Sequence, residues 1–258
     1  MTKVVVNIAK NPTFRFIASG ILSVAVWLSI WELLAYIVDL KFIFPGAIET
    51  FRALGKLIVT LTFWKTVALS MLRIFIGLIL GVIMGAVFAL LYQFVPFLRN
   101  FITIGMTVTK STPVASIIMI MWVVMINGSK DLPAVIALLM VAPIIWQNLC
   151  DAFSSIDQEL SEVCDVFCFS GKKKLRLLIL PQLTKYFVPA FLTSIGLAWK
   201  SGIAAEIISY TKDSIGRNIS NAKSFFEGDV MFAWTFTVVI LSLLFEYSSK
   251  LLLRRWRK

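Results

Sequence analysis

Long apolar runs separated by short polar segments make up most of the sequence. A helix needs about 20 predominantly apolar residues to cross the hydrocarbon core of a bilayer, and six runs come near that length. They are Phe16–Val38, Thr66–Tyr92, Phe101–Ile126, Pro133–Leu149, Thr184–Tyr210 and Val230–Leu253. Between the first two, Ala47–Leu61 carries its charges on one side, which predicts an amphipathic helix along the outer membrane surface. The pattern therefore predicts an all-α, polytopic membrane protein with six transmembrane helices.

The third run is interrupted by polar residues and a proline at Thr109–Pro113. Pro113 lacks a backbone donor and disfavours helical backbone before it. Irregular backbone at membrane depth is tolerated where it lines a cavity or packs on protein, so this stretch is a candidate pathway lining. Its residues are Lys110, Ser111, Thr112 and Pro113. The alternative is a span that begins at Pro113, with Lys110 at the inner surface.

The fifth run contains two ionisable residues well inside an apolar segment, Lys200 and Glu206. Charged side chains inside a membrane are unfavourable and usually mark a pathway or a buried pair. The two residues are six apart, so they are not neighbours on one helix face, and each needs another partner or water. Trp199, Lys200, Ser201 and Glu206 are candidates for the pathway. In the alternative interpretation the charged groups form buried structural pairs.

Glycines recur every fourth residue in the second run, at Gly77, Gly81 and Gly85. This spacing places all three on one helix face, where small residues allow the backbone of another helix to approach closely. The pattern predicts a helix-packing seam. The alternative is that glycine is simply frequent in membrane spans.

The longest polar interruption in the second half of the chain is Ile156–Leu183. Acidic residues come first, a Ser170-Gly171 break follows, and a basic run leads to Pro181. An acid-rich start and a glycine stop are typical of a short solvent-facing helix, and Ser155 with Gln158 fits a capping box at its start. The basic run suits a return to the lipid headgroups.

Composition agrees with a membrane protein, since 59% of residues are hydrophobic, 15% are charged and the mean hydropathy is +0.88. The net charge is +11, but the basic residues flank the apolar runs, so contact with membrane lipid explains them better than nucleic acid does. There is no histidine, and the three cysteines lack metal-ligand spacing. The sequence also lacks a phosphate-binding P-loop. We therefore expect no catalytic site, metal or cofactor.

Lys and Arg number 13 in the segments predicted to lie inside, counted from Lys250 at the C-terminal end, and eight in those predicted outside. Because positive charge accumulates on the cytoplasmic side, this difference predicts that both termini are cytoplasmic. It also places Ile156–Leu183 in the cytosol.

The same loop resembles the cytoplasmic loop of permease subunits of bacterial ABC importers. In that family a Glu followed by two alanines, a later glycine and an I-x-L-P sequence recur, and here Glu162 lies nineteen positions before Pro181 in Ile179-Leu180-Pro181. Val163 and Cys164 replace the alanines, and Cys168 stands at the usual glycine position, with Gly171 three residues later. The resemblance runs from about Phe44 to the C-terminus and is nearest to the nitrate, sulfonate and taurine type.

The resemblance implies a single permease domain over residues 1–258, with its core at about 44–253, in the bacterial inner membrane. It implies ATP hydrolysis by separate ATPase subunits, an extracytoplasmic solute-binding protein, a homodimer and a small, anionic or sulfonate-like solute. The ATPase would contact a short coupling helix. The residues implied in coupling are Ser161, Glu162, Cys164, Asp165, Cys168, Gly171 and Pro181.

Two other classes remain open at this point. A secondary transporter would also have intramembrane charges and broken helices, although such carriers usually show internal repeats, and none is evident between the two halves. A membrane scaffold would explain the apolar runs but not the spacing from Glu162 to Pro181.

Overall fold

The computed structural model describes residues 12–40, 42–125 and 130–256, and all regular secondary structure in this part of the chain is helical. The elements are α2 (Pro12–Val38), α3 (Ala47–Ile58), α4 (Leu61–Phe94), η1 (Pro96–Leu98), α5 (Arg99–Ser111), α6 (Val114–Val124), α7 (Leu132–Ser154), α8 (Gln158–Val166), α9 (Gly171–Lys174), η2 (Leu175–Ile179), α10 (Leu180–Ser209), α11 (Ile215–Ser224) and α12 (Gly228–Trp256). The predicted all-α fold is confirmed. The start of the chain up to Asn11 and the end of the third apolar run at Ile126 lie outside the described residues.

Four of the described helices are long and apolar enough to cross a membrane: Leu61–Phe94, Leu132–Ser154, Gly171–Ser209 and Gly228–Leu251. A fifth crossing is formed if Pro96–Ser111 and Val114–Val124, bent by 105° at their junction, count as one broken span. This bend lies at the predicted interruption before Pro113. Helix α2 coincides with the first predicted run, but its apolar part, Leu22–Val38, is shorter than a span. The chain is therefore a multi-pass membrane protein, and the described helices account for four or five of the six predicted crossings.

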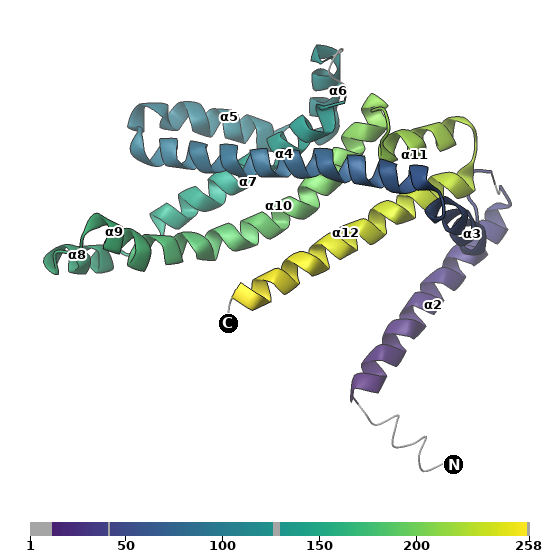
Figure 1. The fold of residues 1–258 in the computed structure, drawn as a ribbon, viewed down its shortest axis with the longest axis horizontal. Helices are drawn as coiled ribbons and strands as arrows, with labels where there is room; N and C mark the ends of the chain where they lie inside the picture. The colour runs from purple at the N-terminus through teal and green to yellow at the C-terminus, as the bar shows by residue number, and fades with distance from the viewer. Residues whose placement is uncertain (1–11, 41, 126–129, 257–258) are drawn as a thin grey trace, which may run out of the picture.

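Helix α7 lies between α4 and α10 and packs along both, which makes these three helices the centre of the bundle (Figure 1). The largest buried side chains of α7, including Ile136, Val141 and Ile145, are fully shielded in this layer. Helix α5 packs against α4 and α7, whereas α12 packs against α10, α11 and α3. The short broken span and the last helix thus flank the central layer on different sides (Figure 1).

The three regularly spaced glycines of α4 all lie against α7. A Cβ atom added to Gly77 would be 2.2 Å from the carbonyl oxygen of Ala134, and one added to Gly85 would be 2.6 Å from that of Ala142. A Cβ atom on Gly81 would be 2.8 Å from the side chain of Val141. Only glycine lets the two helix backbones approach this closely.

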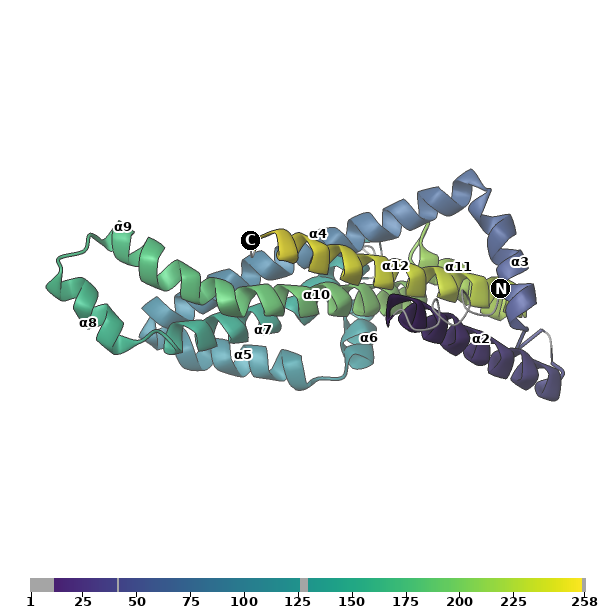
Figure 2. The same cartoon turned by 90° about the horizontal axis from the view of Figure 1, so that it is seen from below.

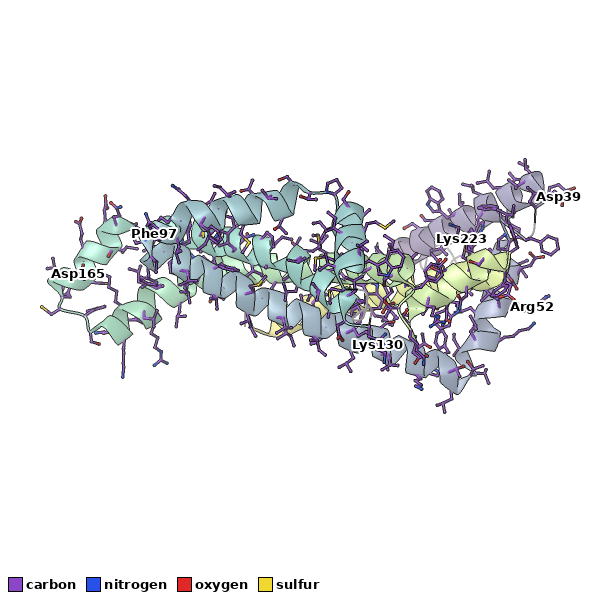
Figure 3. The ribbon with its side chains drawn as sticks, turned by 90° about the horizontal axis from the view of Figure 1, so that it is seen from above. Asp39, Arg52, Phe97, Lys130, Asp165 and Lys223 are labelled. Atoms are coloured by element: carbon purple, nitrogen blue, oxygen red, sulfur yellow. The ribbon has the colours of Figure 1, made fainter. Side chains whose placement is uncertain are left out.

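The elongated molecule has two distinct ends. Helices α8 and α9 protrude at one end, and α3 and α11 lie at the other (Figure 2). Figure 3 shows Asp165 at the end that carries α8, and Phe97 is the labelled residue closest to it in this view. Arg52 and Lys223 lie toward the opposite end.

Glu32, the one acidic residue of the first apolar run, caps the amphipathic helix α3. Its Oε2 accepts a hydrogen bond of 2.7 Å from the backbone N–H of Ala47, the first residue of α3. The Trp31 indole donates to the carbonyl oxygen of Pro45 at 3.1 Å. A carboxylate is favourable at a helix N-terminus because free N–H groups and the helix dipole meet there. Glu32 therefore fixes α3 to α2.

Candidate functional site

The loop between α7 and α10 contains the short helix α8 and projects beyond the rest of the bundle (Figure 2). Helix α8 begins at Gln158 because Asp157 caps it, with the Asp157 carboxylate accepting from the backbone N–H of Glu159 at 2.9 Å. The predicted capping box of Ser155 and Gln158 is wrong. Since α7 continues to Ser154, Ser155 ends α7, and its hydroxyl donates to the carbonyl oxygen of Ala152.

Helix α8 ends in a Schellman turn centred on Cys168. The backbone N–H of Cys168 bonds the carbonyl oxygen of Asp165 at 3.0 Å, and that of Phe169 bonds the carbonyl oxygen of Cys164 at 2.9 Å. Cys168 has a φ of 51°, in the left-handed region that favours glycine. The predicted stop at Gly171 is therefore wrong, because α8 ends at Val166 with Cys168 as its left-handed residue, and Gly171 begins α9.

We expect Cys168→Gly to stabilise this loop by about 1 kcal/mol, because a non-glycine residue in the left-handed region costs about that much. Exchange of the α8 backbone amides with deuterium should become slower in the variant. Cys164→Gly provides the matched control, since it removes a thiol from the interior of α8 and should accelerate exchange. Equal exchange rates in wild type and Cys168→Gly would contradict the assigned strain.

Three contacts connect the loop that contains α8 to the long helix that follows. Lys174 forms an ion pair with Asp165, with Nζ 2.8 and 2.9 Å from the two carboxylate oxygens. The Lys173 ammonium lies 3.9 Å from the centre of the Phe169 ring. At the base of the loop, the Gln182 amide donates to the hydroxyl of Ser155 at 3.0 Å. The loop is thus attached to both α7 and α10.

The basic run does not separate the loop from the membrane span, as the sequence suggested. Instead Gly171–Ser209 is one continuous helix of 39 residues. It widens into the π-helical segment η2 immediately before Pro181, whose ring would clash with the carbonyl of Leu177 in a regular α-helix. The loop therefore leads at Gly171 into a helix that is long and apolar enough to cross the membrane.

The outer surface of α8 is unusually apolar for a segment outside the bundle. Leu160, Val163, Val166 and Phe167 are between 48% and 80% exposed. Glu162 is also exposed, whereas Ser161 and Cys164 are half-buried. Neighbouring apolar and acidic side chains on a projecting helix form a surface suited to binding another protein.

The two polar stretches predicted to line a pathway lie on different parts of the bundle. Lys110, Ser111 and Pro113 are exposed at the bend between α5 and α6. Helix α5 packs on α4 and α7, whereas Lys200 lies on the face of α10 that borders α12. The structure of one chain does not bring Lys110 and Lys200 together.

The residues around Lys200 point in different directions. The Trp199 ring is buried and its indole donates to the carbonyl oxygen of Val238 in α12 at 3.1 Å. Ser201 is also buried and donates to the carbonyl oxygen of Ala198. Lys200 is exposed and makes no hydrogen bond or ion pair with another described residue. Of these three residues, Lys200 is the one with a polar group available to a ligand.

Glu206 is fully buried where α4, α10 and α11 meet. Its Oε2 accepts from the Ser70 hydroxyl at 2.9 Å and from the backbone N–H of Gly216 at 3.1 Å. The Ser70 hydroxyl in turn accepts from the N–H of Ile215, the first residue of α11. Glu206 and Ser70 thus cap the N-terminus of α11. Glu32 caps the N-terminus of α3 in the same way.

A cavity of about 300 Å³ lies between α10 and α12 beside Lys200. Glu246 and Lys250 of α12 also line it, and their side chains form an ion pair of 2.6 Å. Sequence analysis did not single out Glu246. The available signal was a Glu–Lys pair four residues apart inside the last apolar run, a spacing that places both on one helix face. Among the described residues, no group of three or more Cys, Asp and Glu side chains is placed to hold a metal ion.

Comparison with known proteins identifies relatives of the whole chain. Residues 77–258 match the family described as binding-protein-dependent transport system inner membrane component. The chain is 23% identical to SsuC of Bacillus subtilis (strain 168), a permease protein named for aliphatic sulfonates transport, over 92% of this chain and 87% of SsuC. It is 24% identical to the taurine transport system permease protein TauC of Escherichia coli (strain K12), over 95% and 90% of the two chains.

Solved structures with a similar fold are also transporters. A chain of an amino acid ABC transporter solved with histidines superimposes with a TM-score of 0.63 at 14% identity, covering 75% of this chain and 93% of that one. A chain of the inward-facing MetNI methionine ABC transporter gives 0.57 at 18% identity, covering 74% and 93%. These similarities extend the match from sequence to helix arrangement.

Proposed function

Since the chain belongs to the family of binding-protein-dependent transport inner membrane components, and is a permease subunit of an ABC importer, we propose that it carries a small organic anion of the sulfonate class across the membrane. Family membership makes it the non-catalytic transmembrane subunit, which works with ATPase subunits and a solute-binding protein. The sulfonate class comes from the names of SsuC and TauC. Residues 1–258 act as one transmembrane domain.

The observation that carries the coupling mechanism is the attachment of α8 to the start of the long helix that follows it, together with the contact that joins this long helix to the end of α7. Gln182 of α10 is bonded to Ser155 at the end of α7, and Asp165 of α8 is paired with Lys174. ATP-driven closure of the ATPase subunits moves α8, and these contacts transmit the movement to α7 and α10. Because α7 packs along α4 as well, the central layer moves together.

The end carrying α8 faces the cytosol, and the end carrying α3 and α11 faces the solute-binding protein. This orientation is supported by the basic run at Lys172–Arg176 beside α8, since basic residues favour the cytoplasmic surface. Both termini are then cytoplasmic. Two copies related by a two-fold axis form the pathway, which is the most common symmetry of homo-oligomers.

Within the dimer, Lys110–Pro113 and Lys200 line the pathway at different places. Lys200 supports an anionic solute because its ammonium group has no partner among the described residues. Trp199 and Ser201 hold the α10 backbone in place through their buried contacts. Glu206 acts as a structural cap of α11, and it does not contact the solute.

The coupling proposal is tested by placing a charge in the apolar surface of α8. We expect Phe167→Asp to reduce binding-protein-stimulated ATP hydrolysis and transport by about tenfold or more, because a buried unpaired carboxylate opposes docking of the ATPase. Charge reversal in Glu162→Lys should also reduce ATP hydrolysis and transport, but by a smaller factor. Transport into proteoliposomes and co-purification of the ATPase measure the effect.

The matched control is Phe97→Asp, which places the same charge on a 91% exposed phenylalanine in the turn at the same end of the molecule (Figure 3). This variant should retain co-purification and transport. If Phe167→Asp and Glu162→Lys both transport like wild type, α8 does not carry the coupling.

A further inference from the structure

The cavity between α10 and α12 has an unusual chemistry for a membrane-spanning region. Its volume of about 300 Å³ is at the lower end of the range for small-molecule sites. Its lining divides into polar side chains and the apolar side chains of Leu192, Trp199 and Phe245. The Trp199 and Phe245 rings contact each other with centroids 5.1 Å apart. A ligand with one charged group and one short apolar part would match this division.

The charges of the cavity do not cancel. Lys200, Glu246 and Lys250 all line it, and Glu246 is already paired with Lys250 at 2.6 Å. Lys200 makes no ion pair of its own with a described residue, although the Glu246 carboxylate lies within its electrostatic range. Two ammonium groups and one carboxylate leave a net charge of +1. The cavity is therefore suited to one negative charge.

Few other donors in the cavity are available to a ligand. The Thr193 hydroxyl donates to the carbonyl oxygen of Pro189, and the Ser249 hydroxyl donates to that of Phe245. Ser242 is half-buried in the wall, and its hydroxyl makes no hydrogen bond with a described residue. Lys200 and Ser242 thus present unused donors from two helices to one cavity, and space is open at Gly196, where an added Cβ atom would meet nothing within 4 Å.

We propose that this cavity binds the oxyanion group of a small organic monoanion, with Lys200 as its counter-ion and Ser242 as a hydrogen-bond donor. Trp199 and Phe245 hold the apolar part of the ligand, and the Glu246–Lys250 pair limits the site to a single negative charge. An unpaired ammonium group within a membrane-spanning segment is unfavourable, so an oxyanion partner stabilises this arrangement. Two sources provide such a group, a transported sulfonate and an anionic lipid headgroup. The first of these rests on the proposed function.

Binding to the full-length chain in nanodiscs tests the site without the need for ATPase subunits. In the first arm, radiolabelled butane-1-sulfonate is titrated in nanodiscs of phosphatidylcholine. In the second arm, retention of phosphatidylglycerol is measured by native mass spectrometry. Lys200→Gln should weaken binding about tenfold or more, Lys200→Arg should restore most of it, and Glu246→Gln should tighten it severalfold, because charge-assisted hydrogen bonds dominate such sites.

The control is Lys185→Gln, which removes a lysine from the same helix outside the cavity and should bind like wild type. Sulfonate binding that depends on Lys200 supports a solute site, and lipid retention that depends on Lys200 supports a headgroup site. The proposal is overturned if Lys200→Gln changes neither arm, including the case in which neither probe binds. Failure of the coupling through α8 leaves this binding unaffected, so the two proposals fail separately.

Discussion

Alanine at position 77 is expected to destabilise the protein by about 2–3 kcal/mol, the upper part of the range for overpacked positions. The added methyl group would lie 2.2 Å from the carbonyl oxygen of Ala134 and 2.8 Å from its Cα atom. Both atoms belong to the backbone, so no side-chain rotation relieves the clash, and α4 and α7 must separate. Thermal unfolding of the purified chain in detergent, followed by tryptophan fluorescence, measures the loss.

The control for this prediction is Gly105→Ala in α5, because an added Cβ atom there would meet nothing within 4 Å. Alanine favours a helix over glycine by roughly 1 kcal/mol, so this variant should unfold at the wild-type temperature or above it. Gly85→Ala should resemble Gly77→Ala, since its nearest atom is also a backbone oxygen. If Gly77→Ala and Gly105→Ala melt together, the close contact of α4 with α7 does not limit stability.

Much of the helix arrangement was predictable because a span needs a long apolar run. The predicted helix Ala47–Leu61 and the observed α3, Ala47–Ile58, begin at the same residue. The interruption before Pro113 was also visible, since a proline in an apolar run changes the backbone locally. The angle of the bend was not, because it depends on the packing of α5 and α6 against different helices.

The loop was harder to predict because helical and headgroup-binding segments share a composition. Lys172–Arg176 reads as a membrane-surface segment, yet lysine, leucine and arginine are also good helix formers, and Ser170 precedes them at the N-cap position. The chain therefore continues as a helix into the span. Similarly, the polar segment that forms α11 has no long apolar run, and its helix is organised by contacts with α4 and α10.

The roles of the intramembrane acids depended on residues far away in the chain. Glu32 meets Ala47, and Glu206 meets Ser70, which is 136 positions earlier. No local pattern reports such a pairing, so the sequence made Glu206 a candidate for the pathway, with a buried structural pair as the alternative. The structure gives both acids one physical task, which is to accept hydrogen bonds from free N–H groups at the start of a short helix.

Removal of the Glu206 side chain is expected to destabilise the protein by about 3–5 kcal/mol, because two buried donors lose their acceptor and a large side chain is lost from a buried site. Glu206→Ala leaves the Ser70 hydroxyl and the Gly216 N–H without their acceptor in a fully buried site, and it also opens a cavity. The start of α11 should loosen first. Limited digestion with trypsin should therefore cut faster after Lys212 and Arg217, and thermal unfolding should occur at a lower temperature.

Glu206→Gln distinguishes the cap from other roles of this side chain. The amide retains one oxygen, which can accept from Ser70 and Gly216, and its NH₂ group takes the place of Oε1, which has no hydrogen-bond partner among the described residues. The glutamine variant should therefore lose only about 1 kcal/mol, within the usual range for one hydrogen bond, and keep α11 resistant to trypsin. A glutamine variant as unstable as the alanine variant would mean that the negative charge, and not the accepting oxygen, holds α11. An alanine variant as stable as wild type would show that α11 is held by its apolar contacts alone, above all by the fully buried Ile215.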